Sequence, residues 1–248
     1  MKTVGIIGGI GPESTVDYYR LIVSIYRERT QDGSYPSILI NSIDLKRTLD
    51  LIGDNRLAEV TAYLVSEVRR LANAGADFGL LAANTPHLVF DAVAAESPIP
   101  LISIVDAACR EARARRLKRL GLLGTRFTMQ SRFYPDVFQV AGMELVAPNR
   151  GEQNLIHDRY MSELVPGLFR RETREEFVAI IDRLKVQEKI DGLVLAGTEL
   201  PLLLREVEHP GIPYLDTTRL HVERAVTYLL SRDMPDRGVQ RTSESGHG

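Results

Sequence analysis

The clearest pattern along the chain is an apolar run that ends in a polar cluster, and it occurs twice. The first copy is Gly79–His87 (GLLAANTPH) and the second is Gly192–Pro201 (GLVLAGTELP). An apolar run without alternation is expected of a parallel strand that is buried on both faces. Asn, Thr and Pro are common residues at helix starts. Each copy therefore predicts a strand that turns into a helix, with polar groups at the carboxyl edge of a sheet, where open α/β folds bind ligands.

The rest of the chain alternates short apolar runs with stretches of helical periodicity. Further strands are predicted at Thr3–Ile7, Ser37–Asn41, Pro100–Ile104, Arg119–Leu123, Glu144–Val146 and Pro213–Asp216. Helices are predicted at Pro12–Thr30, Leu57–Ala74, Val105–Arg115, Gln130–Ala141, Asn154–Gly167, Thr173–Val186 and Thr217–Arg232. This alternation indicates an α/β protein with doubly wound parallel strands.

The strand–small–hydroxyl element returns a third time at Gly124–Thr128, which suggests that the chain consists of two similar halves. We expect a first α/β domain over residues 1–104 and 213–233 and a second over 105–212. Residues 234–248, rich in Gly, Ser and charge, are expected to form a disordered tail. A single continuous sheet is the alternative arrangement.

Composition narrows the function classes. The 248 residues carry a formal net charge of −2, so nothing favours nucleic acid or an anionic membrane as a partner. No apolar run is long enough to span a bilayer, and the early strand leaves no room for a signal peptide. Cys109 is the only cysteine, which excludes an internal disulfide and predicts a cytoplasmic protein. Its mid-helix position indicates a buried structural thiol.

Two local features point to a bound anion. The turn Gly8–Gly11 follows the first strand, and its glycines permit positive φ and close approach of a ligand. Its spacing departs from the G-x-G-x-x-G of dinucleotide sites, so a tight turn without a ligand is the alternative. Arg47 follows the second strand and could hold a substrate carboxylate. A solvated arginine on a helix is an equal alternative.

Taken together, these motifs resemble the cofactor-independent aspartate/glutamate racemase family over nearly the whole chain. The matching pieces are Met1–Pro12, Asn84–His87, Gly124–Thr128, Thr198–Pro201 and Asp216 with His221. The resemblance implies two Rossmann-like parallel-sheet domains, related by pseudo-two-fold symmetry, with the ligand cleft between them. It also implies a PLP-independent isomerase without a metal, and a homodimer.

The resemblance fails at the family's catalytic positions. In the family, two cysteines on opposite faces of the substrate α-carbon remove and return the α-proton, one just before Asn-Thr and one just before Thr-Glu. Ala83 and Gly197 occupy these positions here. Neither has an acid–base group, and each tenfold loss of rate corresponds to about 1.4 kcal/mol of barrier. The usual reaction is therefore severely impaired unless other residues replace the pair.

His87, Glu199 and Thr198 are the candidate catalytic replacements. The ordinary pKa of His87 suits a general base, while a structural or substrate-orienting role is the alternative. Glu199 would serve as a base if it is partly buried, or else as a partner of a helix dipole. Thr198 is a hydroxyl donor, and His221 is expected to be structural.

The resemblance implies that the substrate-binding residues are better retained than the acid–base pair. The expected ligand contacts are Gly9, Gly11, Ser14, Arg47, Asn84, Thr85, Thr125, Thr128 and Thr198. The resulting hypothesis is an isomerase that acts on a small amino acid or related carboxylic acid. The alternatives are a non-catalytic carboxylate-binding protein and a lyase or decarboxylase in the same cleft.

Overall fold

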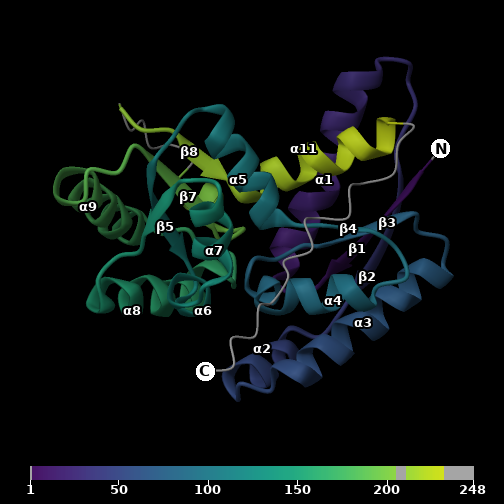
Figure 1. Cartoon of the computed structure of the whole chain (residues 1–248), viewed down its shortest axis with the longest axis horizontal. Coiled ribbons are helices and arrows are strands. Elements are labelled where there is room, and N and C mark those ends of the chain that lie inside the picture. The colour runs from purple at the N-terminus through teal and green to yellow at the C-terminus, as the bar shows by residue number, and fades with distance from the viewer. Residues whose placement is uncertain (1, 205–210, 232–248) are drawn as a thin grey trace.

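The computed structural model describes residues 2–204 and 211–231, and in this part of the chain the strands form two parallel sheets (Figure 1). The first sheet has the order β2-β1-β3-β4, with β1 (Thr3–Gly8), β2 (Ser37–Ser42), β3 (Phe78–Leu81) and β4 (Leu101–Ile102). The second has the equivalent order β6-β5-β7-β8, with β5 (Arg119–Gly124), β6 (Glu144–Val146), β7 (Gly192–Ala196) and β8 (Tyr214–Asp216). We call the parts of the molecule around these sheets the first and second halves.

Helices connect successive strands, which confirms the predicted α/β class. Up to β5 they are α1 (Pro12–Thr30), α2 (Leu45–Gly53), α3 (Leu57–Asn73), the 3-10 helix η1 (Thr85–Val89), α4 (Phe90–Glu96) and α5 (Ile104–Ala114). Later ones are α6 (Arg126–Gln130), α7 (Phe133–Val140), α8 (Arg150–Arg159), the π-helical turn η2 (Tyr160–Leu164), α9 (Arg171–Gln187), α10 (Leu200–Leu204) and α11 (Thr217–Leu230). Within the described ranges, no helix combines the length and apolar character needed to cross a membrane.

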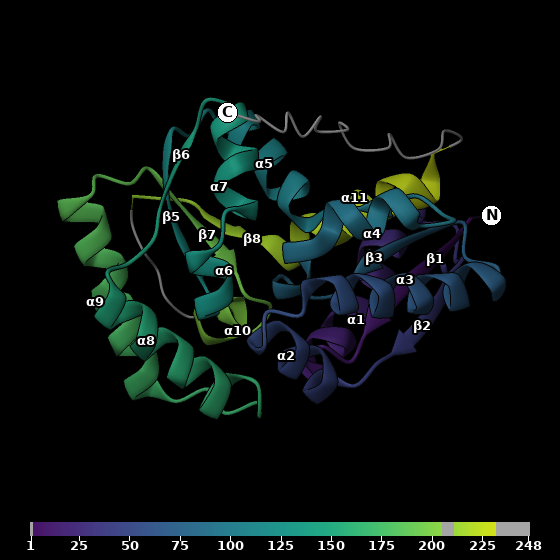
Figure 2. The ribbon, with the colours of Figure 1, turned by 60° about the horizontal axis from the view of Figure 1, so that its bottom comes forward.

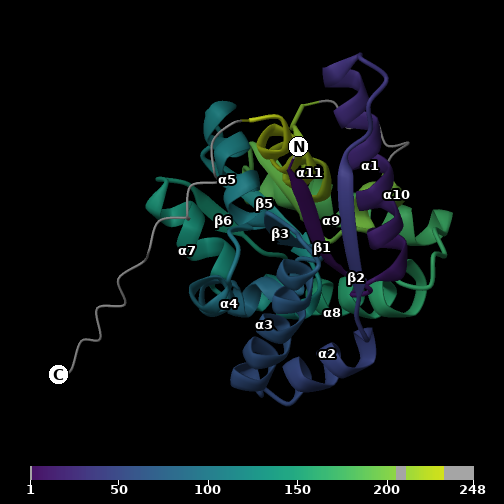
Figure 3. The same ribbon diagram turned by 90° about the vertical axis from the view of Figure 1, so that its right-hand side faces the viewer.

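Both faces of each sheet are covered by helices, which explains why the strands are apolar without alternation. In the first half, α1 and α11 lie on one face and α2, α3 and α4 on the other (Figure 3). In the second half, α5 and α7 cover one face, and α8, α9 and α10 cover the other. Cys109 on α5 is buried in this core, as predicted for a structural thiol.

The final helix of each half crosses to the other half. Helix α5 follows β4 of the first sheet, yet Ile104 and Ala108 pack in the core of the second half. Helix α11 follows β8 of the second sheet, yet Val222 and Val226 pack against the first sheet. The two crossing helices lie against each other at the junction (Figure 1). This reciprocal exchange fixes the halves relative to one another.

This exchange corrects one expectation about domain boundaries. The assignment of residues 213–233 to the first domain is wrong for its strand, because β8 pairs with β7, with Leu215 opposite Val194. The available edge of β3 is already occupied by β4, so β8 extends the second sheet instead. Only α11 returns to the first half. The expected tail at 234–248 lies outside the described residues.

Two helical segments differ from the sequence expectation. Helix α2 was not among the predicted helices, although a helical position was one of the two alternatives for Arg47; its buried side chains include Leu51 and Ile52. The helix expected at 130–141 is present as α7, and residues 126–130, most of which were expected to form a turn, make the short helix α6; the two are separated at Ser131, whose backbone is extended. Helix α2 matters for function, because it forms one wall of the pocket described next.

Candidate active site

A pocket lies between the two halves at the carboxyl ends of β1, β3, β5 and β7, where the sequence predicted a ligand site. Its volume is about 50 Å3, enough for a few water molecules and smaller than most ligand pockets. The first half contributes Ile10, Gly11, Leu45, Leu49, Ile52, Ala83, Asn84 and Thr85. The second half contributes Thr125, Tyr160, Met161, Val165, Ala196, Gly197, Thr198 and Glu199.

Polar side chains that follow β3 connect the halves across this pocket. The hydroxyl oxygens of Thr85 and Thr125 are 3.1 Å apart and share a hydrogen bond. Asn84 accepts a hydrogen bond from the Tyr134 hydroxyl at 2.6 Å and donates one to Thr217 Oγ1 at 3.2 Å. The predicted residues Asn84, Thr85 and Thr125 therefore meet at one place. Tyr134 and Thr217, which orient Asn84, were not predicted.

The two glycines of the first turn have different roles. Gly11 lines the pocket at φ +96°, and an added Cβ would lie 2.9 Å from Glu199 Oε1, so only glycine allows this close approach. Gly9 does not line the pocket. Its Cβ would lie 2.3 Å from the Ile43 carbonyl oxygen, so Gly9 is required by chain packing rather than by a ligand.

Two residues that were expected to contact the ligand lie behind the pocket lining and hydrogen-bond to it or to the residue next to it. The Ser14 hydroxyl donates to the Ala82 carbonyl oxygen at 2.9 Å, one residue before Ala83. Thr128 Oγ1 lies 3.2 Å from Thr125 Oγ1, and the Thr128 amide donates to that same oxygen. Ser14 and Thr128 are both buried and neither lines the pocket. They hold lining residues in position instead of facing a ligand.

The structure directs His87 away from the pocket, which corrects its expected role as a base facing the ligand. Its Nε2 accepts a hydrogen bond from the Ile104 amide at 3.2 Å, so Nδ1 carries the proton and donates to the Ala83 carbonyl oxygen at 2.9 Å. Burial, with a smaller contribution from His221, lowers the pKa of His87 to about 3. His87 is thus a neutral structural residue that joins η1 to the start of α5.

His221 is equally enclosed, as expected for a structural residue. Its Nε2 donates to the Ile102 carbonyl oxygen at 2.9 Å, and its Nδ1 lies 2.8 Å from the Tyr18 hydroxyl. Burial lowers the pKa of His221 to about 4. This ring therefore attaches α11 to β4 and α1 as a neutral group.

Arg47 takes the second of its two expected positions, that of a solvated arginine on a helix. It lies on the exposed side of α2, with its guanidinium carbon 4.1 Å from the centroid of the Tyr63 ring. It lines a separate groove on the surface between α2 and α3, not the pocket between the halves. The helical turn that was missed in the sequence rotates Arg47 outward, so it is not placed to bind a carboxylate in the pocket.

Glu199 is the acidic residue that lines the pocket, and it is 2% exposed. The hydroxyls of Tyr160 and Thr198 both donate to its Oε2, the latter at 2.8 Å. Burial raises the pKa of the Glu199 carboxyl, and these two hydrogen bonds oppose that effect. Burial also raises the pKa of Tyr160, and the nearby Glu199 carboxylate adds to it. A buried carboxyl with a perturbed pKa in a pocket is a candidate for proton transfer.

Tyr160 fills the space beside Gly197. A Cβ built on Gly197 would lie 2.6 Å from Tyr160 Cε2 and 2.9 Å from its hydroxyl oxygen. Ala83, the corresponding position after β3, lines the pocket with a methyl group alone. The place where a side chain at position 197 would begin is thus occupied by an aromatic ring that is itself hydrogen-bonded to Glu199.

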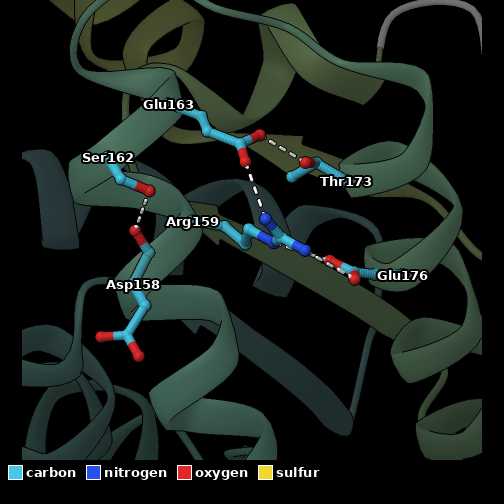
Figure 4. Close-up of polar contacts among 6 residues, drawn as sticks. All are labelled: Asp158, Arg159, Ser162, Glu163, Thr173 and Glu176. Atoms are coloured by element: carbon cyan, nitrogen blue, oxygen red, sulfur yellow. Dashed lines mark hydrogen bonds and ion pairs between the residues drawn. The ribbon is translucent and has the colours of Figure 1, made fainter.

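A polar network joins the residues on either side of Tyr160 to helix α9 (Figure 4). The Arg159 guanidinium binds both oxygens of Glu176 at 2.9 Å and Glu163 Oε1 at 2.9 Å, and Thr173 donates to Glu163. The Val165 amide bonds to the Tyr160 carbonyl, five residues earlier, as in a π-helix. Such turns often occur at functional sites. Nothing in the local sequence distinguished Tyr160 from an ordinary core aromatic, so it was missed.

Comparison with known proteins agrees with this geometry. A family model described as Asp/Glu/hydantoin racemase matches residues 7–225. The chain belongs to this family. The broad specificity amino-acid racemase RacX of Bacillus subtilis (strain 168) is 23% identical over 232 residues, which cover 91% of this chain and 98% of RacX.

Solved structures of the Asp/Glu/hydantoin racemase family have the same fold. An aspartate racemase homologue from Pyrococcus horikoshii OT3 is 33% identical, with a TM-score of 0.78, covering 93% of this chain and 100% of that chain. An Asp/Glu racemase homologue from Yersinia pestis is 28% identical, with a TM-score of 0.85 and the same coverage. The family resemblance and the two-sheet fold are confirmed. The loss of a cysteine pair at Ala83 and Gly197 stays a prediction, as do the homodimer and the cytoplasmic location.

Proposed function

We propose that this chain is a cofactor-independent isomerase that moves the α-proton of a small amino acid or related carboxylic acid, with Glu199 as its acid–base group. The observation that carries this proposal is the position of Glu199: buried, in the pocket between the halves, with a pKa raised by burial. A carboxyl whose pKa is raised is a stronger base when it is ionised, and its pKa is closer to the working pH.

The two hydroxyl donors define which oxygen of Glu199 acts. Tyr160 and Thr198 both bind Oε2, whereas Oε1 lies beside Gly11 on the pocket side. In the proposed step, Oε1 takes the α-proton, the C–H bond breaks, and its electron pair is delocalised onto the substrate carboxyl group. The reverse step returns a proton from Glu199 to carbon. The Thr85 and Thr125 hydroxyls, which also belong to the polar lining, would hold the substrate carboxylate.

The opposite side of the pocket sets the stereochemical expectation. Ala83 has no acid–base group, and its neighbours Asn84 and Thr85 do not titrate near neutral pH. Proton removal therefore takes place on the Glu199 side, and Glu199 returns most protons to that same face; inversion requires a water molecule to deliver the proton on the Ala83 side. Exchange of the α-proton with solvent is expected to be faster than inversion of the α-carbon.

A second candidate function is a binding protein that does not catalyse any reaction. The specific observation in its favour is that Tyr160 and Thr198 already occupy Oε2 of Glu199 and that the Ala83 side carries a methyl group alone. A cleft that only holds a ligand requires no acid–base group on either face.

Proton NMR in D2O tests the two functions. Wild type is incubated with L-alanine, L-valine, L-aspartate and L-glutamate, and the α-proton signal is followed together with the enantiomer ratio. The test variant is Glu199→Gln. The matched control is Glu67→Gln, which changes another buried glutamate, bound by Asn41 at 2.7 Å and not part of the pocket lining.

The proposal predicts loss of an α-proton signal with wild type and Glu67→Gln, and at least a hundredfold slower loss with Glu199→Gln, since removing a general base typically costs that much. Equal exchange by wild type and Glu199→Gln would show that Glu199 is not the base. Saturable binding of a ligand without any exchange would favour the binding protein.

A further inference from the structure

We propose that the pocket selects acids with one carboxylate and a small apolar side chain, in preference to aspartate and glutamate. This inference rests on the proposed class of ligand, a small amino acid or related carboxylic acid. It concerns which member of that class the described residues accept.

Two helices supply an apolar wall for the pocket. Leu45, Leu49 and Ile52 of α2 are spaced by four and three residues, so they share one face of that helix. Met161 and Val165, on and just after η2, are spaced by four residues and come from the second half. Figure 2 shows α2 at the junction between the halves, on the side where the second half approaches. A ligand side chain that leaves the polar strand ends meets this wall.

Positive charge is absent from the lining that the structure describes. None of these lining residues is Lys, Arg or His. Arg47 belongs to α2, but its guanidinium lies over the Tyr63 ring outside the pocket. Arg159 immediately precedes Tyr160, yet it is not part of the lining and its guanidinium pairs with Glu163 and Glu176 (Figure 4).

The balance of charge therefore discriminates between ligands. The hydroxyls of Thr85 and Thr125 offer donors for one carboxylate at the strand ends. A second carboxylate would lie against leucine, isoleucine and valine side chains and near Glu199, without a cation to pair with it. Burying such a charge unpaired is strongly unfavourable.

Titration calorimetry, or ligand-observed NMR where binding is weak, measures this preference directly. The probes are L-alanine, L-2-aminobutyrate, L-valine, L-aspartate and L-glutamate. We expect the tightest apolar probe to bind at least about tenfold more tightly than either dicarboxylate. Dicarboxylate binding that equals or exceeds that of the apolar probes would overturn the inference, and so would failure of every apolar probe to bind.

A charge introduced into the wall provides the second test. Leu49→Arg places a cation on the pocket side of α2 and should raise the affinity for L-aspartate relative to L-valine by about tenfold or more. Leu155→Arg makes the same change at an exposed position of α8, outside the pocket, and should leave the ratio unchanged. An unchanged ratio in a folded Leu49→Arg variant contradicts the inference.

These readouts separate the inference from the proposed isomerase activity, because binding requires no proton transfer. Apolar acids that bind without exchanging their α-proton would support the inference and defeat the isomerase proposal. Glu199-dependent exchange of the L-aspartate α-proton, with weak binding of every apolar acid, would support the isomerase proposal and contradict the inference.

Discussion

Gly197→Ala is expected to destabilise the protein through Tyr160 alone. The new Cβ would lie 2.6 Å from Tyr160 Cε2, about 1 Å inside ordinary van der Waals contact. Tyr160 is 5% exposed and its hydroxyl is bound to Glu199, so the ring has little freedom to move aside. Overpacking of this kind typically costs about 1–3 kcal/mol of the free energy of unfolding. For a chain of this size that corresponds to a Tm lower by roughly 2–12 °C.

A double-mutant cycle isolates this contact. Urea unfolding is measured for wild type, Gly197→Ala, Tyr160→Val and the double variant. Because valine removes the ring, Gly197→Ala should cost less than about 0.5 kcal/mol in that background, giving a coupling of about 1–3 kcal/mol. Gly53→Ala is the control, since its Cβ meets no atom within 4 Å, and it should not lower stability. An equal cost of Gly197→Ala in both backgrounds would refute the reasoning.

The same contact determines how cysteines could be restored. Ala83→Cys with Gly197→Cys returns the residues that the family resemblance implies, but the second sulfur has no room beside the Tyr160 ring. We expect this variant to unfold more easily and to racemise amino acids measurably only when Tyr160→Val is added. Racemisation by the variant with two cysteines and an intact Tyr160, followed by polarimetry, would contradict this expectation.

Three further predictions concern buried polar groups. Tyr134→Phe leaves Asn84 Oδ1 without its donor and should lower the free energy of unfolding by about 1–3 kcal/mol, measured in urea. His87 has a pKa of about 3 when folded against 6.5 when unfolded, so stability falls as the pH drops below 6.5. Between pH 7 and pH 5 the decrease in the free energy of unfolding should be about 1–2 kcal/mol smaller in His87→Gln than in wild type. The pKa of the Glu199 carboxyl is raised in the folded state, so its protonation stabilises the folded state at low pH. This stabilisation is lost as the pH rises from 4.5 through the folded pKa. Glu199→Gln should therefore gain stability relative to wild type over this range, and a parallel pH dependence would contradict the assignment.

Local sequence pattern was sufficient where strand ends define the site. The two copies of apolar run and polar cluster became β3 and β7, and Asn84, Thr85, Thr198 and Glu199, which follow them, line the pocket. These residues come directly after a strand, where the geometry of the sheet alone brings them to one edge. Their position depends little on distant parts of the chain.

Sequence reasoning failed where the direction of a side chain depends on the turn that carries it. The 3-10 turn after Asn84 points His87 at two backbone groups, and helix α2 rotates Arg47 toward Tyr63. Neither rotation is specified by spacing alone. Tyr160 reaches Gly197 only through tertiary packing of η2, which no local pattern reveals. The pairing of β8 with β7 was missed for the same reason, because a three-residue strand fits either sheet edge.

The central claim is that Glu199 is the acid–base group of this pocket, and α-proton exchange in D2O tests it most directly. With wild type, L-alanine or L-valine should lose its α-proton signal faster than its configuration inverts. With Glu199→Gln, folded to the same extent by circular dichroism, the signal should persist. Exchange at the wild-type rate in Glu199→Gln, or none in wild type with every amino acid offered, would contradict the account.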